Sequence, residues 1–381
     1  MTKQKYARIF ILIFIISIFT TFFYVVLSGY INDPLQIYHK PFFRKTEYSN
    51  SMRESALARI KNSNFDSVIV GNSYSENISS KKASEIFGNK FINLSMTGSN
   101  ASEKNLLLNY IFNKHNVKNV VYYMDIIYFL NPNATINRPF DNGINNWKAL
   151  YDNKPYNDYQ VYLSSKYFTC NIMFSSKCLD KIYNIDEANS WEKDEKHYRR
   201  FGGFKNWLKY YNDPQIEADF KTLVDTPNKI HTVPLEKAYQ EDLKKYLDNS
   251  IFEIVKNNPN TNFYFIIAPE TDLALAEEIR KDTFEKKFFA WKYIVSQNAK
   301  YKNAKLLAFD DENKITKIEN FKDKYHYKNW INYYILQSIK NNEHFLNETN
   351  IDNYIDKVYE KAINVNFEKY IKLIKKNPYK K

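Results

Sequence analysis

The chain has 381 residues, which is long enough to bury a sizeable core and to form one large or two modest domains. Its formal net charge is +12, but eight of the basic residues lie near the two ends, at Lys3, Lys5, Arg8, Lys372, Lys375, Lys376, Lys380 and Lys381. About +4 remains for the body of the chain, which carries no basic stripe, so a nucleic-acid-binding protein is excluded.

Residues 9–28 are the first expected element, and their sequence, IFILIFIISIFTTFFYVVLS, holds no charged residue. A helix of this length spans about 30 Å, the thickness of the hydrocarbon core of a bilayer. The run is too long for a typical signal-peptide core, and no A-x-A cleavage site follows it. We expect an uncleaved signal anchor over residues 1–30, with a cytoplasmic tip because basic residues precede the span. A cleaved signal is the alternative; it also places the remaining chain outside the cytoplasm.

The body of the chain, residues 63–347, follows a stalk over residues 31–62 and alternates short apolar strands with helices. Strands are expected at 67–70, 91–94, 117–124, 262–268 and 305–309, and helices at 100–114, 234–257, 271–298 and 327–341. Strands that alternate with helices predict a parallel sheet, and all-apolar strands predict burial on both faces. The expected fold class is therefore α/β, with three layers and a parallel sheet in the middle.

Residues 131–233 interrupt this order, because the stretch is rich in Asn, Tyr, Trp and Lys and has poor periodicity. We expect a largely helical insertion, either a lid or a small subdomain. It holds the only two cysteines, Cys170 and Cys178, which outside the cytoplasm are candidates for a disulfide; two free thiols are the alternative. Residues 348–381 are expected to form a helical C-terminal segment with a basic tail.

A serine, Ser73, stands just after the expected strand 67–70, in the sequence Gly71-Asn-Ser-Tyr-Ser. In open α/β sheets, ligands bind beyond the carboxyl ends of the strands. A serine that opens a helix there has its backbone N–H directed at the site, where the helix dipole favours an anion. The alternative is an ordinary helix cap, which small polar residues often form.

A serine is a poor nucleophile unless a base takes its proton, and the chain has only six histidines. His326 differs from the others because it follows the last expected strand and precedes a helix. Asp323 lies three residues before it, a spacing that lets a local turn bring the carboxylate to the imidazole. Asp323 as a helix cap is the alternative, and both roles are compatible.

Asn93 and Gly98 follow the second expected strand, in the sequence INLSMTGSN. With only seven glycines in the chain, a glycine at this place indicates a backbone constraint, such as positive φ or close approach to a ligand. The N–H groups of Gly98 and Ser73 are expected to face the same oxyanion.

Taken together, these short blocks resemble the SGNH (GDSL-like) hydrolase superfamily over roughly residues 64–342. The resemblance implies that Ser73 is the nucleophile, that His326 is the base held by Asp323, and that Gly98 belongs to the oxyanion site. It also implies the three-layer, flavodoxin-like fold of that superfamily. With its N-terminal anchor, the chain is similar to the membrane-anchored branch that includes the alginate O-acetylation and lipoteichoic-acid D-alanylation proteins. The resemblance to that branch implies that the substrate is a cell-surface polysaccharide and that the partner is a membrane-bound O-acyltransferase.

The chain departs from the family pattern at two places. The first block has Asn72 where the family usually has Asp, and Tyr74 follows the serine; Tyr74 and Asn93 are expected to line the substrate site. At the end of the third strand, Asp125 stands where the family supplies an oxyanion-binding Asn. We therefore expect Asn131 or Asn133 to donate instead.

These observations predict a serine O-acyltransferase or carbohydrate esterase, anchored in the cytoplasmic membrane, that acts outside the cytoplasm on O-acyl groups, in particular O-acetyl groups, of a polysaccharide. No metal and no cofactor are expected. The alternative is a catalytically inactive scaffold that binds glycan or assembles a surface-polysaccharide complex. In that case Trp147, Trp191 and Trp207 of the insertion are candidates for stacking on sugars, although core positions explain them equally well.

Overall fold

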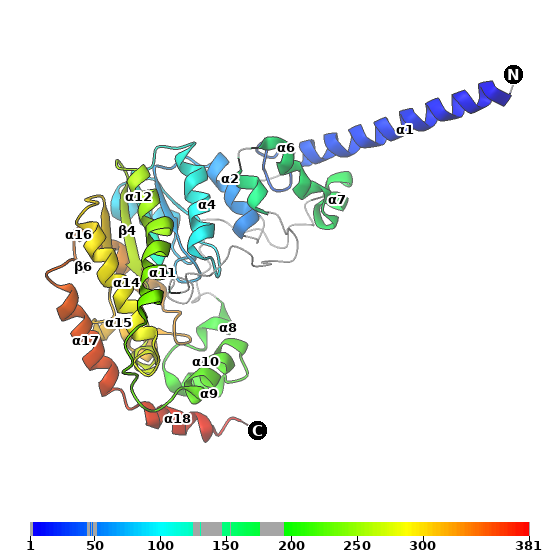
Figure 1. Cartoon of the computed structure of the whole chain (residues 1–381). Coiled ribbons are helices and arrows are strands. Elements are labelled where there is room, and N and C mark those ends of the chain that lie inside the picture. The colour runs from blue at the N-terminus through cyan, green and yellow to red at the C-terminus, as the bar shows by residue number, and fades with distance from the viewer. Residues whose placement is uncertain are drawn as a thin grey trace. The chain divides into compact units, whose positions relative to one another are not determined.

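The computed structural model of the chain describes residues 3–43, 46, 48, 52–124, 130, 147–152, 154–175 and 194–380. It is an α/β structure with a six-stranded, mostly parallel sheet and a long apolar N-terminal helix (Figure 1). The chain divides into two compact units, one of residues 1–63 and 137–184 and the other of residues 64–136 and 185–381. The predicted insertion is therefore shared between the two units.

The sheet of the second unit has the strand order β2-β1-β3-β4-β5-β6. Its strands are β1 (Ser67–Val70), β2 (Phe91–Asn93), β3 (Asn119–Met124), β4 (Asn262–Ile267), β5 (Ala304–Leu307) and β6 (Phe345–Leu346). The first five strands are parallel, as the alternating pattern predicts, whereas β6 pairs antiparallel with β5. Every residue of β1, β2 and β3 is buried, in agreement with their apolar sequences. The expected parallel sheet is confirmed for β1 to β5, and the antiparallel β6 was not predicted because two residues are too short a strand to show a pattern.

The order of the strands reverses between β1 and β3. The chain runs from β1 outward to β2, and then returns to the other side of β1 to form β3, β4 and β5. In open α/β sheets, the crevice for a ligand lies at the carboxyl ends of the two strands where this reversal occurs. The carboxyl ends of β1 and β3, at Val70 and Met124, are therefore the expected location of a site.

The described helices of the second unit include those predicted at 100–114, 234–257, 271–298 and 327–341, of which the second and third are each divided. They are α3 (Ser80–Phe87), α4 (Ala101–Phe112), α8 (Glu195–Tyr198), α9 (Phe204–Lys209), α10 (Pro214–Asp225), α11 (Lys237–Leu247), α12 (Glu253–Asn257), α13 (Asp272–Glu278), α14 (Thr283–Asn298), α15 (Asn313–Thr316), α16 (Asn329–Asn341), α17 (Ile351–Asn364) and α18 (Phe367–Lys375). A π-helical turn, Asp248–Phe252, joins α11 to α12. The C-terminal helix is broken because Asn366 caps α18 by accepting from the Lys369 N–H.

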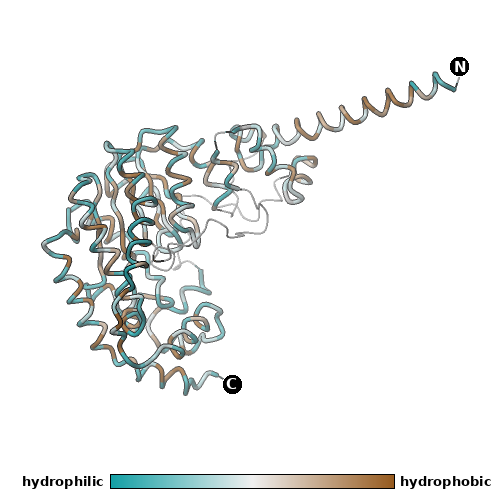
Figure 2. The backbone as a smooth tube through the Cα atoms, in the orientation of Figure 1, coloured by the Kyte–Doolittle hydropathy of each residue, from teal (hydrophilic) through white to brown (hydrophobic). Residues whose placement is uncertain are grey.

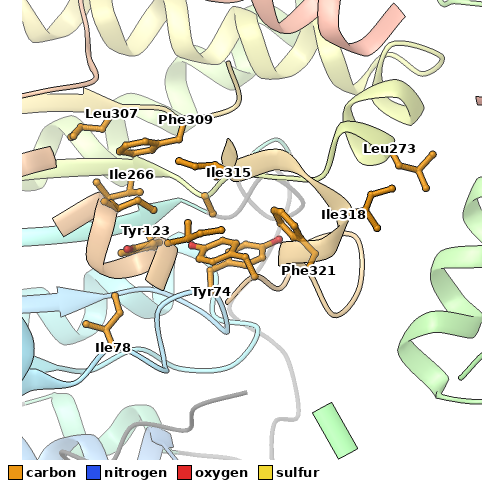
Figure 3. Close-up of a cluster of buried hydrophobic side chains, with 14 of the residues drawn as sticks. Tyr74, Ile78, Tyr123, Ile266, Leu273, Leu307, Phe309, Ile315, Ile318 and Phe321 are labelled. Atoms are coloured by element: carbon orange, nitrogen blue, oxygen red, sulfur yellow. The ribbon is translucent and has the colours of Figure 1, made fainter. Parts of the chain in front are cut away.

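A large apolar cluster fills the second unit between the sheet and the segment after β5. Figure 3 shows side chains of this cluster, from Ile266 and Leu307 on the strands to Ile315 and Phe321 in the segment that follows. Phe321 is fully buried and forms a β-bridge with Tyr327, which is also buried. The loop between these two residues is therefore fixed at both ends by the core.

The first unit contains the N-terminal helix and a group of short helices. These are α1 (Lys3–Asn32), α2 (Met52–Asn62), η1 (Trp147–Tyr151), α6 (Pro155–Asp158), η2 (Tyr159–Leu163) and α7 (Ser165–Ile172). Most of α1 is apolar, as its brown colour in Figure 2 shows, and it is long and apolar enough to be a membrane anchor or a signal sequence. The last turns of α1 are buried, at Ser28, Gly29 and Asn32, by the short helices of this unit.

Gly71→Ala is expected to destabilise the second unit by about 1–3 kcal/mol, the usual cost of overpacking. A Cβ at position 71 would lie 2.8 Å from Cβ of Tyr123 and even closer to the Ser75 hydroxyl. Gly88→Ala is the comparison, because a Cβ added there would meet no atom within 4 Å and alanine at its φ of +75° costs only about 1 kcal/mol of backbone strain. Thermal unfolding of the full chain in detergent should show a larger loss for Gly71→Ala; equal or smaller loss would contradict this packing argument.

Candidate active site

Ser73 lies in the turn that follows β1, at the carboxyl edge of the sheet. Asn72 is fully buried and holds the turn, because its side-chain oxygen accepts from the Tyr74 N–H at 3.1 Å and its carbonyl accepts from the Ser75 N–H at 3.2 Å. Residues 73–77 form turns, and α3 begins only at Ser80. The expectation that Ser73 opens a helix is therefore wrong, and a helix dipole does not act on it.

A continuous chain of hydrogen bonds joins Ser73, His326 and Asp323. The Ser73 Oγ lies 2.8 Å from Nε2 of His326, although the two residues are 253 positions apart in the sequence. The other ring nitrogen, Nδ1, lies 2.8 Å and 2.9 Å from the two carboxylate oxygens of Asp323. The structure thus brings together the three residues predicted as nucleophile, base and orienting acid, in the connectivity that a serine nucleophile requires.

The loop that carries His326 is built by the predicted local turn. Oδ1 of Asp323 accepts from the backbone N–H groups of Tyr325, at 3.0 Å, and of His326, at 2.8 Å. The N–H of Lys322 donates to the carbonyl of His326 at 2.9 Å and closes the loop. Asp323 therefore caps the turn and also orients the imidazole, so the two alternatives for this residue hold together.

The charges around the site favour a neutral imidazole beside an ionised carboxylate. Burial lowers the pKa of His326, and the nearby Lys322 ammonium lowers it further, against the opposing effect of Asp323. Asp323 is fully buried, which alone would raise its pKa, but His326 and Lys322 hold that pKa well below its usual range. Lys322 Nζ lies 3.2 Å from Oδ2 of Asp323. A neutral ring can accept the Ser73 proton on Nε2 while its Nδ1–H remains donated to Asp323.

The turn around Gly98 is held against the turn of Ser73. The carbonyl of Gly71 accepts from the Met96 N–H at 2.9 Å and from the Ser99 hydroxyl at 2.8 Å. Gly98 has φ +61°, the positive value that its glycine indicated. Within the described part of the chain, neither the Ser73 N–H nor the Gly98 N–H donates a hydrogen bond. Both N–H groups therefore remain candidates for oxyanion donors, and their convergence on one oxyanion stays a prediction.

Asn93 and Tyr74 both lie beside the site, and their contacts show different roles. Asn93 Nδ2 donates to the carbonyls of Ser75 and Ile78, both at 2.8 Å, so its two amide hydrogens shape the turn after Ser73 rather than bind a substrate. The Tyr74 ring is buried, and its centroid lies 5.6 Å from that of the His326 ring. The ring therefore packs beside the imidazole as part of the apolar core, and its expected role in lining a substrate site stays a prediction.

Asn332, which no sequence motif singles out, lies at the centre of the contacts that support the site. It is fully buried on α16. Its Nδ2 donates to the carbonyl of Tyr74 at 2.9 Å and to Asn77 Oδ1 at 2.7 Å. Its Oδ1 accepts from the hydroxyls of Tyr123, at 2.9 Å, and Tyr327, at 3.2 Å. One amide thus links β3, the serine turn and the histidine loop.

Several predicted residues fall outside the residues that the structure describes. These are Asp125, Asn131, Asn133, Cys178 and Trp191. The further oxyanion donor and the disulfide between Cys170 and Cys178 therefore stay predictions. Among the described residues, no group of three His, Cys, Asp or Glu side chains is placed to hold a metal ion.

Comparison with known proteins does not assign the chain to a family. No protein-family model matches the chain, and a search of curated proteins returns no match. The function is therefore inferred from the geometry of the described residues and from the short sequence blocks that resemble the SGNH superfamily.

The reactivity of Ser73 is expected to persist below pH 6.5, because the pKa of His326 is lowered from that value. The imidazole accepts a proton only when neutral, so reactivity should be full above this pKa and fall as the pH drops through it. Lys322→Met should move the midpoint upward, since the Lys322 ammonium lowers the pKa of His326. The rate of fluorophosphonate labelling between pH 4 and 8 measures both effects. Lys340→Met, on the exposed side of α16, is the control; a midpoint unaffected by Lys322→Met would contradict the assignment.

Asn332→Leu is expected to destabilise the second unit by about 2–3 kcal/mol, since buried polar partners lose their hydrogen bonds. It should also slow labelling of Ser73 in the protein that remains folded, because the serine turn and the histidine loop lose their common support. Thermal unfolding and labelling of the full chain measure the two effects. Gln337→Leu, an exposed position on the same helix, should change neither. Normal stability and labelling in Asn332→Leu would show that the amide is dispensable.

Proposed function

We propose that the chain is a serine acyltransferase or esterase of SGNH type that forms an acyl-serine intermediate. The observation that carries the proposal is the hydrogen-bonded chain from Ser73 through His326 to Asp323, at the strand ends where the sheet order reverses. The parallel order 2-1-3-4-5 is that of flavodoxin-like folds, which supports the three-layer SGNH type. The glycine-containing turns at Gly71 and Gly98 support it as well.

The proposed reaction begins when Ser73 Oγ attacks the carbonyl carbon of an acyl ester. His326 Nε2 takes the serine proton as the C–O bond forms, and Asp323 stabilises the imidazolium. The N–H groups of Ser73 and Gly98 donate to the oxyanion. The tetrahedral intermediate then collapses, His326 returns the proton to the leaving alcohol, and the acyl group stays on Ser73.

The second half of the reaction decides between the two activities. A sugar hydroxyl gives its proton to His326 and attacks the acyl-serine in a transferase, whereas water does so in an esterase; each restores Ser73. We propose an O-acetylated cell-surface polysaccharide as the substrate, by resemblance to the membrane-anchored branch of the superfamily. A transferase outside the cytoplasm has no acyl-CoA, so its acyl group would come across the membrane through a partner such as a membrane-bound O-acyltransferase.

We further propose that α1 is retained as an anchor in the cytoplasmic membrane, with the folded units outside the cytoplasm. The buried last turns of α1 support this, because removal of the helix would expose the residues that pack on them. Asn32, for example, donates to the carbonyl of Cys170 at 3.2 Å. A cleaved signal would not be expected to form part of the mature fold.

An inactive glycan-binding scaffold is less well supported. Trp147 and Trp207 are both buried, so neither ring is available to stack on a sugar. Trp191 lies outside the described residues. The hydrogen-bonded Ser73 and His326 would also have no purpose in a scaffold.

Labelling of the full chain in detergent with a fluorophosphonate probe tests the proposal. We expect an adduct on Ser73, with labelling and p-nitrophenyl acetate turnover reduced by about 10³-fold or more in Ser73→Ala and His326→Ala, as for other catalytic triads. Ser79→Ala is the matched control, because Ser79 is a half-buried serine that only caps α3. Absence of labelling in the folded protein, or full turnover by Ser73→Ala, would contradict the proposed nucleophile.

A further inference from the structure

An apolar surface lies at the end of α7 in the first unit. Its residues are Phe168, Met173 and Phe174, whose exposed fractions are 37%, 71% and 50%, together with the partly exposed Ile172. On the opposite side of the helix, Tyr167, Cys170 and Asn171 are buried. At its C-terminal end, α7 therefore has a buried side and an outward side that is apolar instead of polar.

This surface is fixed to the apolar helix α1. The Tyr24 hydroxyl donates to the carbonyl of Ile172 at 2.9 Å, and Asn32 Nδ2 donates to that of Cys170. At Gly29 a Cβ would lie 2.6 Å from the Tyr159 hydroxyl, so the short helices approach α1 as closely as a glycine permits. The end of α7 is therefore held at the level of Tyr24.

The depth of Tyr24 along the proposed membrane-spanning part of α1 determines whether lipid or water surrounds the apolar surface of α7. Tyr24 belongs to the apolar run 9–28 and lies four residues before its end, which is about 6 Å along a helix axis. If α1 spans the bilayer, as in the proposed function on which this inference depends, the end of α7 lies at the outer boundary of the hydrocarbon. Tyrosines such as Tyr24 and Tyr159 are typical of this boundary. Exposed apolar side chains there contact lipid rather than bulk water.

The backbone at Phe174 supports a role for its side chain. Phe174 has φ +48°, a left-handed conformation that glycine adopts far more readily than a bulky residue. It ends α7 in a Schellman motif, in which the Ser175 N–H donates to the carbonyl of Cys170 at 2.9 Å and the Phe174 N–H to that of Asn171 at 3.3 Å. A phenylalanine at the position that favours glycine is costly for folding, so its exposed ring is expected to have another use.

We propose that Phe168, Ile172, Met173 and Phe174 form a second membrane contact, which inserts into the outer leaflet beside α1. The occupant of this surface is lipid, at the boundary between head groups and acyl chains. The span and the inserted surface together fix the orientation of the first unit on the membrane, which a single flexible span would not do.

Photo-cross-linking of the full chain in phosphatidylcholine vesicles tests this inference. The vesicles contain a phosphatidylcholine with a diazirine on one acyl chain, and cross-linked peptides are mapped by mass spectrometry. We expect adducts on α1 and on residues 168–174. Vesicles that contain the same phosphatidylcholine without the diazirine are the control and should give no adducts.

Phe174→Gly separates lipid contact from a structural role. It should reduce cross-linking of residues 168–174 while keeping or raising the thermal stability of the chain, because glycine relieves the left-handed strain. Adducts confined to α1 would overturn the inference, and would show that the surface faces water or another protein. Absence of adducts from α1 as well would overturn the proposed anchor together with this inference, whereas labelling of Ser73 tests the catalytic proposal independently.

Discussion

The candidate site depends on one buried amide, that of Asn332. Ser73 and His326 lie on loops that are 253 residues apart in sequence, and a 2.8 Å contact between them requires both loops to be held to a common support. Asn332 provides it, because it donates to the carbonyl of Tyr74 beside the serine and accepts from the hydroxyl of Tyr327 beside the histidine. In a buried environment such fully satisfied hydrogen bonds fix geometry more strictly than apolar packing does.

The topology of the sheet and the charges near His326 then make this geometry suitable for nucleophilic catalysis. The reversal of strand order between β1 and β3 places the serine turn at the carboxyl ends of the strands, at the switch point where open α/β sheets bind their ligands. Burial and Lys322 lower the pKa of His326, while the pKa of Asp323 is held well below its usual range by His326 and Lys322, which favours a carboxylate that accepts from Nδ1. Positioning, proton acceptance and access therefore come from three separate parts of the fold: a helix side chain, a charged loop and the topology of the sheet.

Much of this arrangement could be predicted from the sequence, because its signals are local. Apolar strands, the rare Gly71 and Gly98, and an Asp three residues before His326 each occupy a short segment. The role of Asn332 could not be predicted, since its partners are supplied by distant segments; its only signal is a polar residue among the buried apolar positions of α16. The antiparallel β6 is too short to show a pattern, and Ser73 proved to lie in a turn rather than at a helix start.

The most direct test of the proposed covalent mechanism is detection of the acyl-enzyme itself. The full chain would be mixed with p-nitrophenyl acetate, quenched in acid within the first turnover, digested and analysed by peptide mass spectrometry. We predict one acetyl group on the peptide that contains Ser73 and none in His326→Ala, because the serine then lacks its base. Turnover without an acetylated Ser73, or acetyl on another residue that turns over at the same rate, would contradict an acyl-serine mechanism.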